Sequence, residues 1–299
     1  MKTISVVGCG KAGKTLCRLW VSRGIVQLRS VLTRSLRSAE RAVAFIGAGR
    51  AVQDISELEP ADLVMIATGD GAIGPCCRAV AQTGLIDADT VVFHLSGALS
   101  SAVLQPAARV GAAVGSVHPI HSFADPRSAV ETFPGSYCAV EGDQRAYPSL
   151  EELFRPLGAV LFPIRPEQKT IYHAGTVFAC NYLVALVEVA LRCFDRAGVD
   201  RQTATKLIEP IVRGTVDNVF RLGPAGALTG PVARGDLLVI VEHLEALGQW
   251  NEQLGRLYRE LGCVAAQLAE DQSTCPPEAM AAVRPLLARA APNLRKATV

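Results

Sequence analysis

The sequence predicts an α/β fold, with a doubly wound parallel sheet in the first half of the chain and helices alone in the second. Three observations lead to this prediction. Short apolar runs alternate with amphipathic, helix-like stretches through the first half. A glycine-rich segment, GCGKAG, joins the first apolar run to the first helix-like stretch. From Lys169 onward, long apolar stretches of helical character replace the strand-like runs.

Composition and charge favour a globular protein without a nucleic-acid or membrane partner. The chain has 299 residues, 49% hydrophobic and 19% charged, which is enough for one large core or two of ordinary size. A formal net charge of +2 does not favour a nucleic-acid partner. No apolar run reaches the ~18 residues of a membrane span, and the start does not resemble a signal peptide, so we expect a cytoplasmic protein with no membrane partner. The nine cysteines form no CxxC pair and are expected to be free thiols.

Runs of small and β-branched residues mark the expected strands. Strands are expected at residues 4–8, 26–33, 62–68, 90–96 and 112–119, with edge strands at 137–142 and 158–164. A first helix is expected at residues 12–23. Glycine, serine, aspartate and proline stand at the ends of these runs, as is usual for connections. Strands that alternate with helices in this way imply parallel βαβ units.

The second half is expected to be helical throughout. One long apolar helix is expected over residues 173–198, ending at Gly198, with further helices at 200–221, 236–268 and 276–291. Two prolines in PIRPEQ, just before Lys169, disfavour regular structure and indicate the boundary between two domains. We therefore expect one domain over residues 1–165 and a second over 166–299.

The GCGKAG segment predicts a dinucleotide site because it follows a strand and begins a helix. Gly8 would allow the tight turn, Gly10 the approach of the backbone to a pyrophosphate, and Gly13 the packing of the helix against the strand. The pyrophosphate would lie on free N–H groups at the positive end of the helix dipole. The alternative is a structural turn without a ligand. The residues expected around the pyrophosphate are Gly8, Cys9, Gly10, Lys11, Ala12 and Gly13.

The residues after the second strand indicate which dinucleotide is bound. NAD sites usually carry an acidic residue there for the ribose 2′-OH, whereas this chain reads VLTRSLRSAER and has no acid before Glu40. A 2′-phosphate prefers guanidinium and hydroxyl groups. We therefore predict NADP(H), held by Arg34 with Thr33 and Ser35. The alternative is that Arg34 and the arginines after it form a solvated helix face.

Polar residues collect at the carboxyl ends of the later strands, where ligands bind in open α/β sheets. These ends read ATGDGAI, HLSGALSS and SVHPIHSFADP, and they hold three of the five histidines. His118, in a loop, is a candidate acid-base group for hydride transfer, whereas His94, inside a strand, is expected to be a buried, hydrogen-bonded core residue. No carboxylate or thiol cluster supports a metal site at HPIH. The residues expected beside the cofactor are Thr68, Gly69, Asp70, Ser96 and Gly97.

Three polar residues stand out at the start of the helical half: Lys169, His173 and Asn181. His173 and Asn181 are eight residues apart, so they would share one face of a continuous helix, and Glu188 would lie near that face. Such a stripe either faces a cleft or is satisfied within the protein, and both interpretations remain open.

These motifs together resemble the 6-phosphogluconate-dehydrogenase-like superfamily of two-domain NADP oxidoreductases, which includes pyrroline-5-carboxylate reductase, prephenate dehydrogenase and the deazaflavin-dependent NADP oxidoreductases. The resemblance is greatest to a bacterial branch with a helical C-terminal domain of unknown function. It rests on HLSGALSS, GSVHPIHSFAD, YHAGTVFACNYLVAL and LTGPVARGD, and it covers nearly the whole chain. It implies an N-terminal Rossmann domain and a helical domain that pairs with a second subunit in a homodimer.

HPI at His118 resembles the HPM of prephenate dehydrogenases, whose histidine meets the substrate. The resemblance implies that Ser96, His118, His173 and Asn181 line a cleft that faces the nicotinamide. We therefore expect an NADP(H)-dependent oxidoreductase that moves hydride between the nicotinamide and a small carbonyl, imine or hydroxy compound in the interdomain cleft.

In this hypothesis His118 is the acid-base group, Ser96 and Asn181 orient the substrate, and His173 and Lys169 support them. Two alternatives stay open. One is a sensor that binds NADP(H) without chemistry, and the other is an oxidoreductase that exchanges hydride with a deazaflavin.

Overall fold

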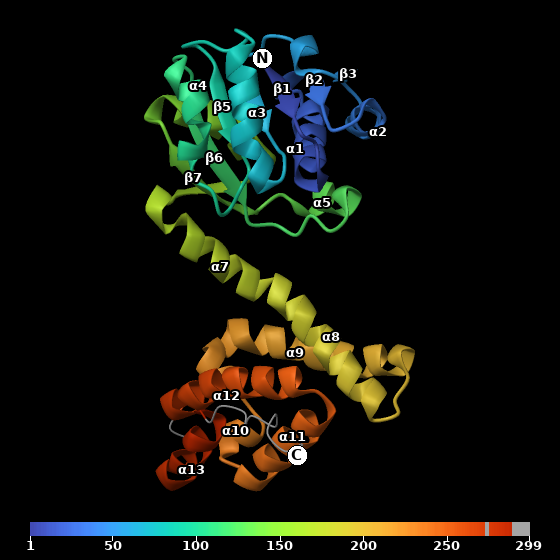
Figure 1. The fold of residues 1–299 in the computed structure, drawn as a ribbon, viewed down its shortest axis with the longest axis vertical. Helices are drawn as coiled ribbons and strands as arrows, with labels where there is room; N and C mark the ends of the chain where they lie inside the picture. The colour runs from blue at the N-terminus through green and yellow to red at the C-terminus, as the bar shows by residue number, and fades with distance from the viewer. Residues whose placement is uncertain (273–274, 289–299) are drawn as a thin grey trace, which may run out of the picture. The chain divides into compact units, whose positions relative to one another are not determined.

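The computed structural model describes residues 1–272 and 275–288. These residues fall into two compact units, the first Met1–Leu183 and the second beginning at Val184. The first unit is built on one sheet, and the second is helical (Figure 1). The sheet ends at Pro163, close to the expected domain boundary. The first unit nevertheless continues to Leu183, because the helix that follows the sheet contacts the strand ends.

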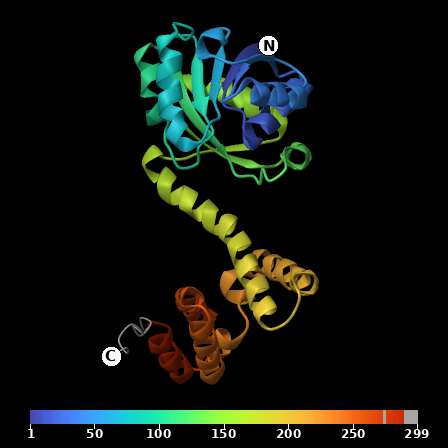
Figure 2. The same cartoon turned by 45° about the vertical axis from the view of Figure 1, so that its right-hand side comes forward.

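Eight strands form the sheet of the first unit in the order β3-β2-β1-β4-β5-β6-β7-β8. Figure 2 shows this sheet turned by 45° from the view of Figure 1. All neighbours are parallel except β6 and β7. The first six strands follow the order of a Rossmann sheet, which confirms the predicted fold class. The strands are β1 (Lys2–Val7), β2 (Val26–Leu32), β3 (Arg50–Val52), β4 (Leu63–Ile66), β5 (Val91–His94), β6 (Ala113–Pro119), β7 (Tyr137–Gly142) and β8 (Val160–Pro163).

Helices cover both faces of this sheet. Side chains of one strand alternate between two cores. Phe93 of β5 packs with Trp20 and Phe154 on one face, whereas Val92 belongs to the core on the other face, with Cys77. The first core is formed with α1 and α6, and the second with α3 and α4. The helices of this part are α1 (Lys11–Ser22), α2 (Leu36–Ile46), α3 (Asp70–Gln82), α4 (Gln105–Arg109), α5 (Pro126–Thr132) and α6 (Tyr147–Phe154).

The rest of the described chain is helical, as predicted, but two of the expected helices are divided. The helix expected over 173–198 begins at Lys169 and is interrupted at Cys180, whose φ and ψ are −117° and −66°. The helix expected over 236–268 is interrupted at Asn251, because the Asn251 side chain accepts hydrogen bonds from the N–H groups of Gln253 and Leu254 and so caps a new helix. The helices are α7 (Lys169–Ala179), α8 (Asn181–Arg196), α9 (Arg201–Ala227), α10 (Pro231–Arg234), α11 (Leu237–Trp250), α12 (Glu252–Gln272) and α13 (Pro277–Ala288).

The second unit has its own core, made by α10 to α13 around Ile240, Ala266 and Val283. The helix expected over 200–221 continues to Ala227 and has a kink at Gly223, where φ is +75°. The final part of the helix expected over 276–291, residues 289–291, lies outside the described residues.

One helical stretch, Pro166–Arg196, is long and apolar enough to cross a membrane by length and composition, with a mean hydropathy of 1.7. The expectation that no apolar stretch reaches this length was therefore wrong, because the polar residues of this stretch are too few to offset its aliphatic ones. A single helix of this kind is weak evidence of a membrane span, since core helices of other proteins share these properties.

Candidate functional site

The glycine-rich loop lies between β1 and α1, and its three glycines have distinct surroundings. Gly8 has a φ of +80°, and a Cβ there would lie 2.5 Å from Cγ2 of Thr68. A Cβ on Gly13 would lie 3.2 Å from Cβ of Ala67, so this glycine lets α1 pack closely on the end of β4. A Cβ on Gly10 would meet no atom within 4 Å. Open space therefore lies beside Gly10, the glycine that we expect to face the pyrophosphate.

The N-terminus of α1 is suited to an anion. Gly10 is its N-cap and offers no side chain, so no side-chain oxygen of the N-cap binds the first N–H groups of the helix. Lys11 points elsewhere: its Nζ donates to the carbonyl oxygen of Ala124, in the loop after β6, over 2.7 Å. Cys9 is buried in the core beside the loop, and Ala12 lies in the first turn of α1. The residues present therefore fit a dinucleotide pyrophosphate, although its binding stays a prediction.

Thr33, Arg34 and Ser35 follow β2, next to the glycine-rich loop. The backbone N–H of Gly8 donates to the carbonyl oxygen of Leu32 over 2.7 Å, which holds the two segments together. Ser35 caps α2 by accepting from the N–H of Ser38, and Thr33 Oγ1 donates to the carbonyl oxygen of Ser35. Arg34 is exposed, and its guanidinium has no partner among the described residues. This free guanidinium is available to a 2′-phosphate.

Thr68, Gly69 and Asp70 follow β4. The methyl group of Thr68 lies over Gly8, as described above, and its hydroxyl donates to the carbonyl oxygen of Gly69 over 3.2 Å. Gly69 is the N-cap of α3 and, like Gly10, provides no side chain to cap the helix. Asp70 is exposed in the first turn of α3. Two helices with N-caps that offer no side chain therefore begin at the carboxyl ends of the neighbouring strands β1 and β4.

A second group of residues lies at the ends of β5 and β6, against α7. Nδ1 of His118 lies 2.8 Å from the hydroxyl of Tyr172. The ring of His118 packs edge to face on Tyr172 and on His173, with centroids 5.6 Å apart in both pairs. A Cβ on Gly97 would lie 2.4 Å from Cδ2 of His173 and 2.7 Å from Nε2 of His118. We call Gly97, His118, Tyr172 and His173 the histidine cluster.

The electrostatics of the cluster keep His118 neutral. The pKa of His118 is lowered to about 4, mainly by burial and also by the nearby His173 and Lys169. A neutral imidazole carries one donor and one acceptor nitrogen. Nδ1 meets Tyr172, so Nε2 is the nitrogen left for a ligand, and it faces Gly97.

Lys169 lies beneath the strand ends, with only 1% of its side chain exposed. Its Nζ donates to the carbonyl oxygen of Ser96 over 2.9 Å, to the hydroxyl of Ser116, and to Glu141 over 3.3 Å. Burial lowers the pKa of Lys169, whereas the carboxylate of Glu141 raises it. Because an ammonium has three protons and this one has three acceptors, Lys169 is fully engaged within the protein.

Glu141 completes this buried network and was not singled out by the sequence analysis. It also accepts from the backbone N–H and the hydroxyl of Ser101, over 2.8 and 2.7 Å. Its signal in the sequence is an acidic residue inside the apolar strand YCAVEG, because a buried carboxylate requires partners.

His94 and Ser96 shape the turn after β5. His94 is wholly buried, its Nδ1 accepts from the N–H of Ser96, and its Nε2 lies 3.2 Å from the carbonyl oxygen of Ser100, which confirms it as a core residue. The hydroxyl oxygen of Ser96 accepts from the N–H groups of Ala98 and Leu99. Its own proton remains available to a ligand.

Asn181 and Glu188 are the other two polar residues of the expected stripe. Asn181 is exposed at the start of α8, beyond the interruption at Cys180, and its side chain has no partner among the described residues. Glu188 pairs with Arg192 and Arg201 over 2.9 and 2.5 Å, and these bonds lower its pKa to about 2. The expectation of one continuous helix through His173 and Asn181 was wrong, because the helix is broken at Cys180. Glu188 is satisfied within the protein by arginines, which is one of the two interpretations left open for the polar stripe.

His121 supports the loop after β6. Its two ring nitrogens lie 3.2 Å from the hydroxyl of Thr132 and 3.0 Å from that of Ser136, and its ring packs on Phe123 and Phe133. No group of three or more His, Cys, Asp or Glu side chains in residues 1–272 and 275–288 is placed to hold a metal ion.

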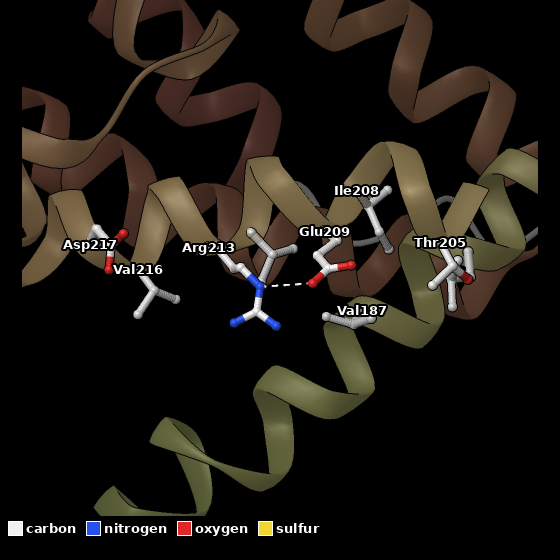
Figure 3. Close-up of a pocket in the computed structure, with 9 residues that line it drawn as sticks. Val187, Thr205, Ile208, Glu209, Arg213, Val216 and Asp217 are labelled. Carbon is white, nitrogen blue, oxygen red and sulfur yellow. Dashed lines mark hydrogen bonds and ion pairs between the residues drawn. The ribbon is translucent and has the colours of Figure 1, made fainter. Parts of the chain in front are cut away.

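A separate hollow of about 530 Å³ lies between α8 and α9 in the second unit. Figure 3 shows Val187 of α8 opposite Ile208 of α9, beside an ion pair of 2.9 Å between Glu209 and Arg213. No residue predicted to bind the cofactor or the substrate lines this hollow.

Comparison with known proteins gives two family matches. A Rossmann-like domain matches residues 2–119, and DUF2520, a domain of unknown function, matches residues 136–265. None of the curated proteins matches this chain in sequence. The first part of the chain is thus similar to Rossmann-like domains and most of the second part to DUF2520.

Three solved structures share the fold along most of the chain. A candidate NADP oxidoreductase from Bacteroides fragilis has a TM-score of 0.74 and 20% identity over 88% of this chain and 97% of that one. A protein from Thermotoga maritima has a TM-score of 0.69 and 26% identity, over 90% and 99%. Pyrroline carboxylate reductase from Plasmodium falciparum, solved with NADP bound, has a TM-score of 0.57 and 12% identity, over 95% and 98%.

Proposed function

We propose that this chain is an NADP(H)-dependent oxidoreductase that transfers hydride between the nicotinamide and a small carbonyl, imine or hydroxy compound. The observation that carries the proposal is the convergence of His118 and His173 over Gly97, at the carboxyl edge of the sheet that also holds the glycine-rich loop. That edge is where ligands bind in open α/β sheets. The names of several structural neighbours, which are reductases, support the same class.

The cofactor would be held by the free N–H groups at the start of α1 and by Arg34. The space beside Gly10 leaves room for a pyrophosphate, and the free guanidinium of Arg34 suits the 2′-phosphate that distinguishes NADP from NAD. When bound, the cofactor supplies or accepts the hydride. Cys9, Lys11, Thr68 and Asp70 belong to this proposed site through their backbone and their place around the loop.

The substrate would meet groups of the histidine cluster and its neighbour Ser96. Nε2 of His118 exchanges a proton with the substrate, and the hydroxyl of Ser96 donates a hydrogen bond to it. Lys169 acts as a positioning residue, because its three bonds fix the turn after β5 and leave none for a substrate. A role for Asn181 in orienting the substrate stays a prediction.

A homodimer through the helical part of the chain is included in the proposal. Large apolar side chains of the second unit are exposed, among them Phe220 at 86%, Leu238 at 78% and Val184 at 69%. Exposed apolar surface of this extent marks an interaction site. A second copy of the chain would cover it, in a cytoplasmic enzyme whose other partner is a small-molecule substrate.

The proposal is tested by titrating the purified protein with NADPH and with NADH while nicotinamide fluorescence is followed. We expect NADPH to bind at least about tenfold more tightly than NADH. Carbonyl and imine compounds are then screened for oxidation of the bound NADPH. Binding without turnover of any compound would favour the non-catalytic sensor, and binding of neither nucleotide would refute the proposal.

A further inference from the structure

We propose that Tyr172 is a positioning residue for His118: its hydroxyl donates to Nδ1, so the ring carries its proton on Nε2, the nitrogen that faces Gly97. The hydrogen bond is 2.8 Å long, and the two rings meet edge to face. The role in chemistry rests on the proposed function. The hydrogen-bond direction does not, because it concerns the protein alone.

The direction of the bond follows from the partners that are present. Had Nδ1 carried the proton, it would donate to the Tyr172 oxygen, and the phenolic proton would then need another acceptor. Among the described residues the hydroxyl of Tyr172 has no partner other than His118. With Tyr172 as the donor, one bond satisfies both the phenolic proton and the lone pair of Nδ1.

Helix α7 presents Tyr172 to His118 because Lys169 fixes the helix. Lys169, Tyr172 and His173 are three and four residues apart, so they lie on one face of α7. The buried bonds of Lys169 hold that face against the strand ends, and Tyr172 also packs on Phe162 of β8, with ring centroids 6.3 Å apart. The bonds of Lys169 and the contact with Phe162 therefore fix the position of the Tyr172 hydroxyl.

This arrangement lets a neutral His118 donate a proton. If a substrate carbonyl were reduced at this site, its oxygen would take the proton from Nε2, and Nδ1 would take the proton of Tyr172. The products are the hydroxy compound, neutral His118 protonated on Nδ1, and the Tyr172 phenolate. When the product leaves, Nε2 takes a proton from water and Nδ1 returns its proton to the phenolate, which restores the resting state. No imidazolate forms. Burial raises the pKa of Tyr172 to about 12, so the phenol holds its proton until the substrate oxygen becomes basic.

The test is to determine the tautomer of His118 by NMR of the full-length protein with ¹⁵N-labelled histidine, without cofactor. The His118 signals are assigned from a His118→Asn sample. We expect the Nε2-protonated form in the wild type and a mixture of tautomers in Tyr172→Phe. Tyr137→Phe is the matched control, because Tyr137 packs on the same Phe162 but has no hydrogen bond to a histidine. The control is expected to give the wild-type spectrum.

A wild-type ring protonated on Nδ1, or an unchanged spectrum in Tyr172→Phe, would overturn the inference. Tyr172→Phe keeps the ring, so folding is checked by comparing its midpoint of thermal unfolding with that of Tyr137→Phe. If a substrate is in hand, Tyr172→Phe is expected to lower kcat at least about tenfold with an unchanged KM for NADPH. A protein without any turnover would refute the proposed function and leave the NMR result to decide the hydrogen bond.

Discussion

Lys169 and Glu141 form an ion pair of 3.3 Å in which only 1% and 2% of the side chains are exposed. The pair joins α7 to β7, and through the carbonyl oxygen of Ser96 it also reaches the turn after β5. It therefore ties two segments of the proposed site, α7 and the turn after β5, to the buried strand β7.

Removal of one partner of this ion pair is expected to lower the stability of the folded protein strongly. Lys169→Met leaves the Glu141 carboxylate buried without its counter-ion, and we expect the free energy of unfolding to fall by about 3–5 kcal/mol. The surface pair of Lys2 with Glu152 gives the control, since Lys2→Met is expected to cost less than about 1 kcal/mol. Urea denaturation measures both. Equal losses in the two variants would contradict the structural role of Lys169.

Gly97→Ala tests whether the histidine cluster needs its glycine. The added methyl group would meet both imidazoles, so one ring must move. A displacement of about 1 Å can lower turnover about 100-fold, and we expect a loss of this order at saturating NADPH. Gly175→Ala is the control, because Gly175 lies on α7, the helix of His173, and a Cβ there would meet nothing within 4 Å. Wild-type turnover in Gly97→Ala would show that the close approach has no catalytic importance.

Arg34→Ala tests the choice of cofactor. Loss of the guanidinium is expected to weaken NADPH binding about 10- to 100-fold and to leave NADH binding unchanged, because only NADPH carries the 2′-phosphate. Arg37→Ala, one turn away on the exposed face of α2, is the control and is expected to change neither. Fluorescence titration measures the four affinities. A loss of the same size for both nucleotides would argue against a 2′-phosphate contact.

The low pKa of His118 predicts two effects of acid. The unfolded chain binds a proton at this residue below about pH 6.5, whereas the folded chain binds it only near pH 4, so the free energy of unfolding falls as pH decreases between these values. His118 contributes up to about 3 kcal/mol of this loss, and His118→Asn should abolish that share. Urea denaturation from pH 4 to 7 gives the difference between the two curves.

The lowered pKa of His118 also predicts how turnover depends on pH. If His118 is the acid-base group, kcat/KM stays constant down to about pH 5 and declines only near the pKa of about 4. A decline centred near pH 6.5 would indicate that His118 is not the titrating group or that its ring is accessible to water.

Phe220→Glu tests the homodimer. A charge in place of this exposed apolar side chain of the proposed interface is expected to oppose association, and light scattering after size exclusion would then give a monomer. Val110→Glu, an exposed apolar residue of the first unit, is the control and should leave the dimer intact. A wild-type protein that is monomeric at all concentrations would contradict this part of the proposal.

The sequence predicts most of the fold because parallel strands, buried on both faces, read as uninterrupted apolar runs that end in glycine or serine. All seven predicted strands are present. β3 was not predicted, since it has only three residues and begins with Arg50. The interruption at Cys180 was not predicted either, because the apolar, helix-forming sequence continues through it.

The candidate site could be predicted only in part. The glycine-rich pattern between the first strand and the first helix indicated Gly8 and Gly13, and the apolar strand around His94 indicated a core residue. His118 was expected in a loop, whereas it lies inside β6, one residue before the strand ends. Tyr172 and Glu141 were missed, because their importance comes from partners far away in the sequence, His118 and Lys169, and no local pattern records such contacts. Lys169 was predicted to support catalysis, but its three buried acceptors became visible only in the structure.

Several hydrogen bonds hold the turn after β5. Ser96 accepts from Lys169 through its carbonyl oxygen and donates to His94 through its N–H. Its hydroxyl oxygen accepts from the N–H groups of Ala98 and Leu99. For protein engineering, the alignment of the reacting atoms and the choice of substrate therefore depend on different residues. Such a braced turn preserves the alignment of the reacting atoms while other parts of the chain are altered. A library intended to widen substrate range should therefore leave Ser96 and Gly97 untouched and vary side chains outside the brace, for example Ile120 in the exposed loop after β6.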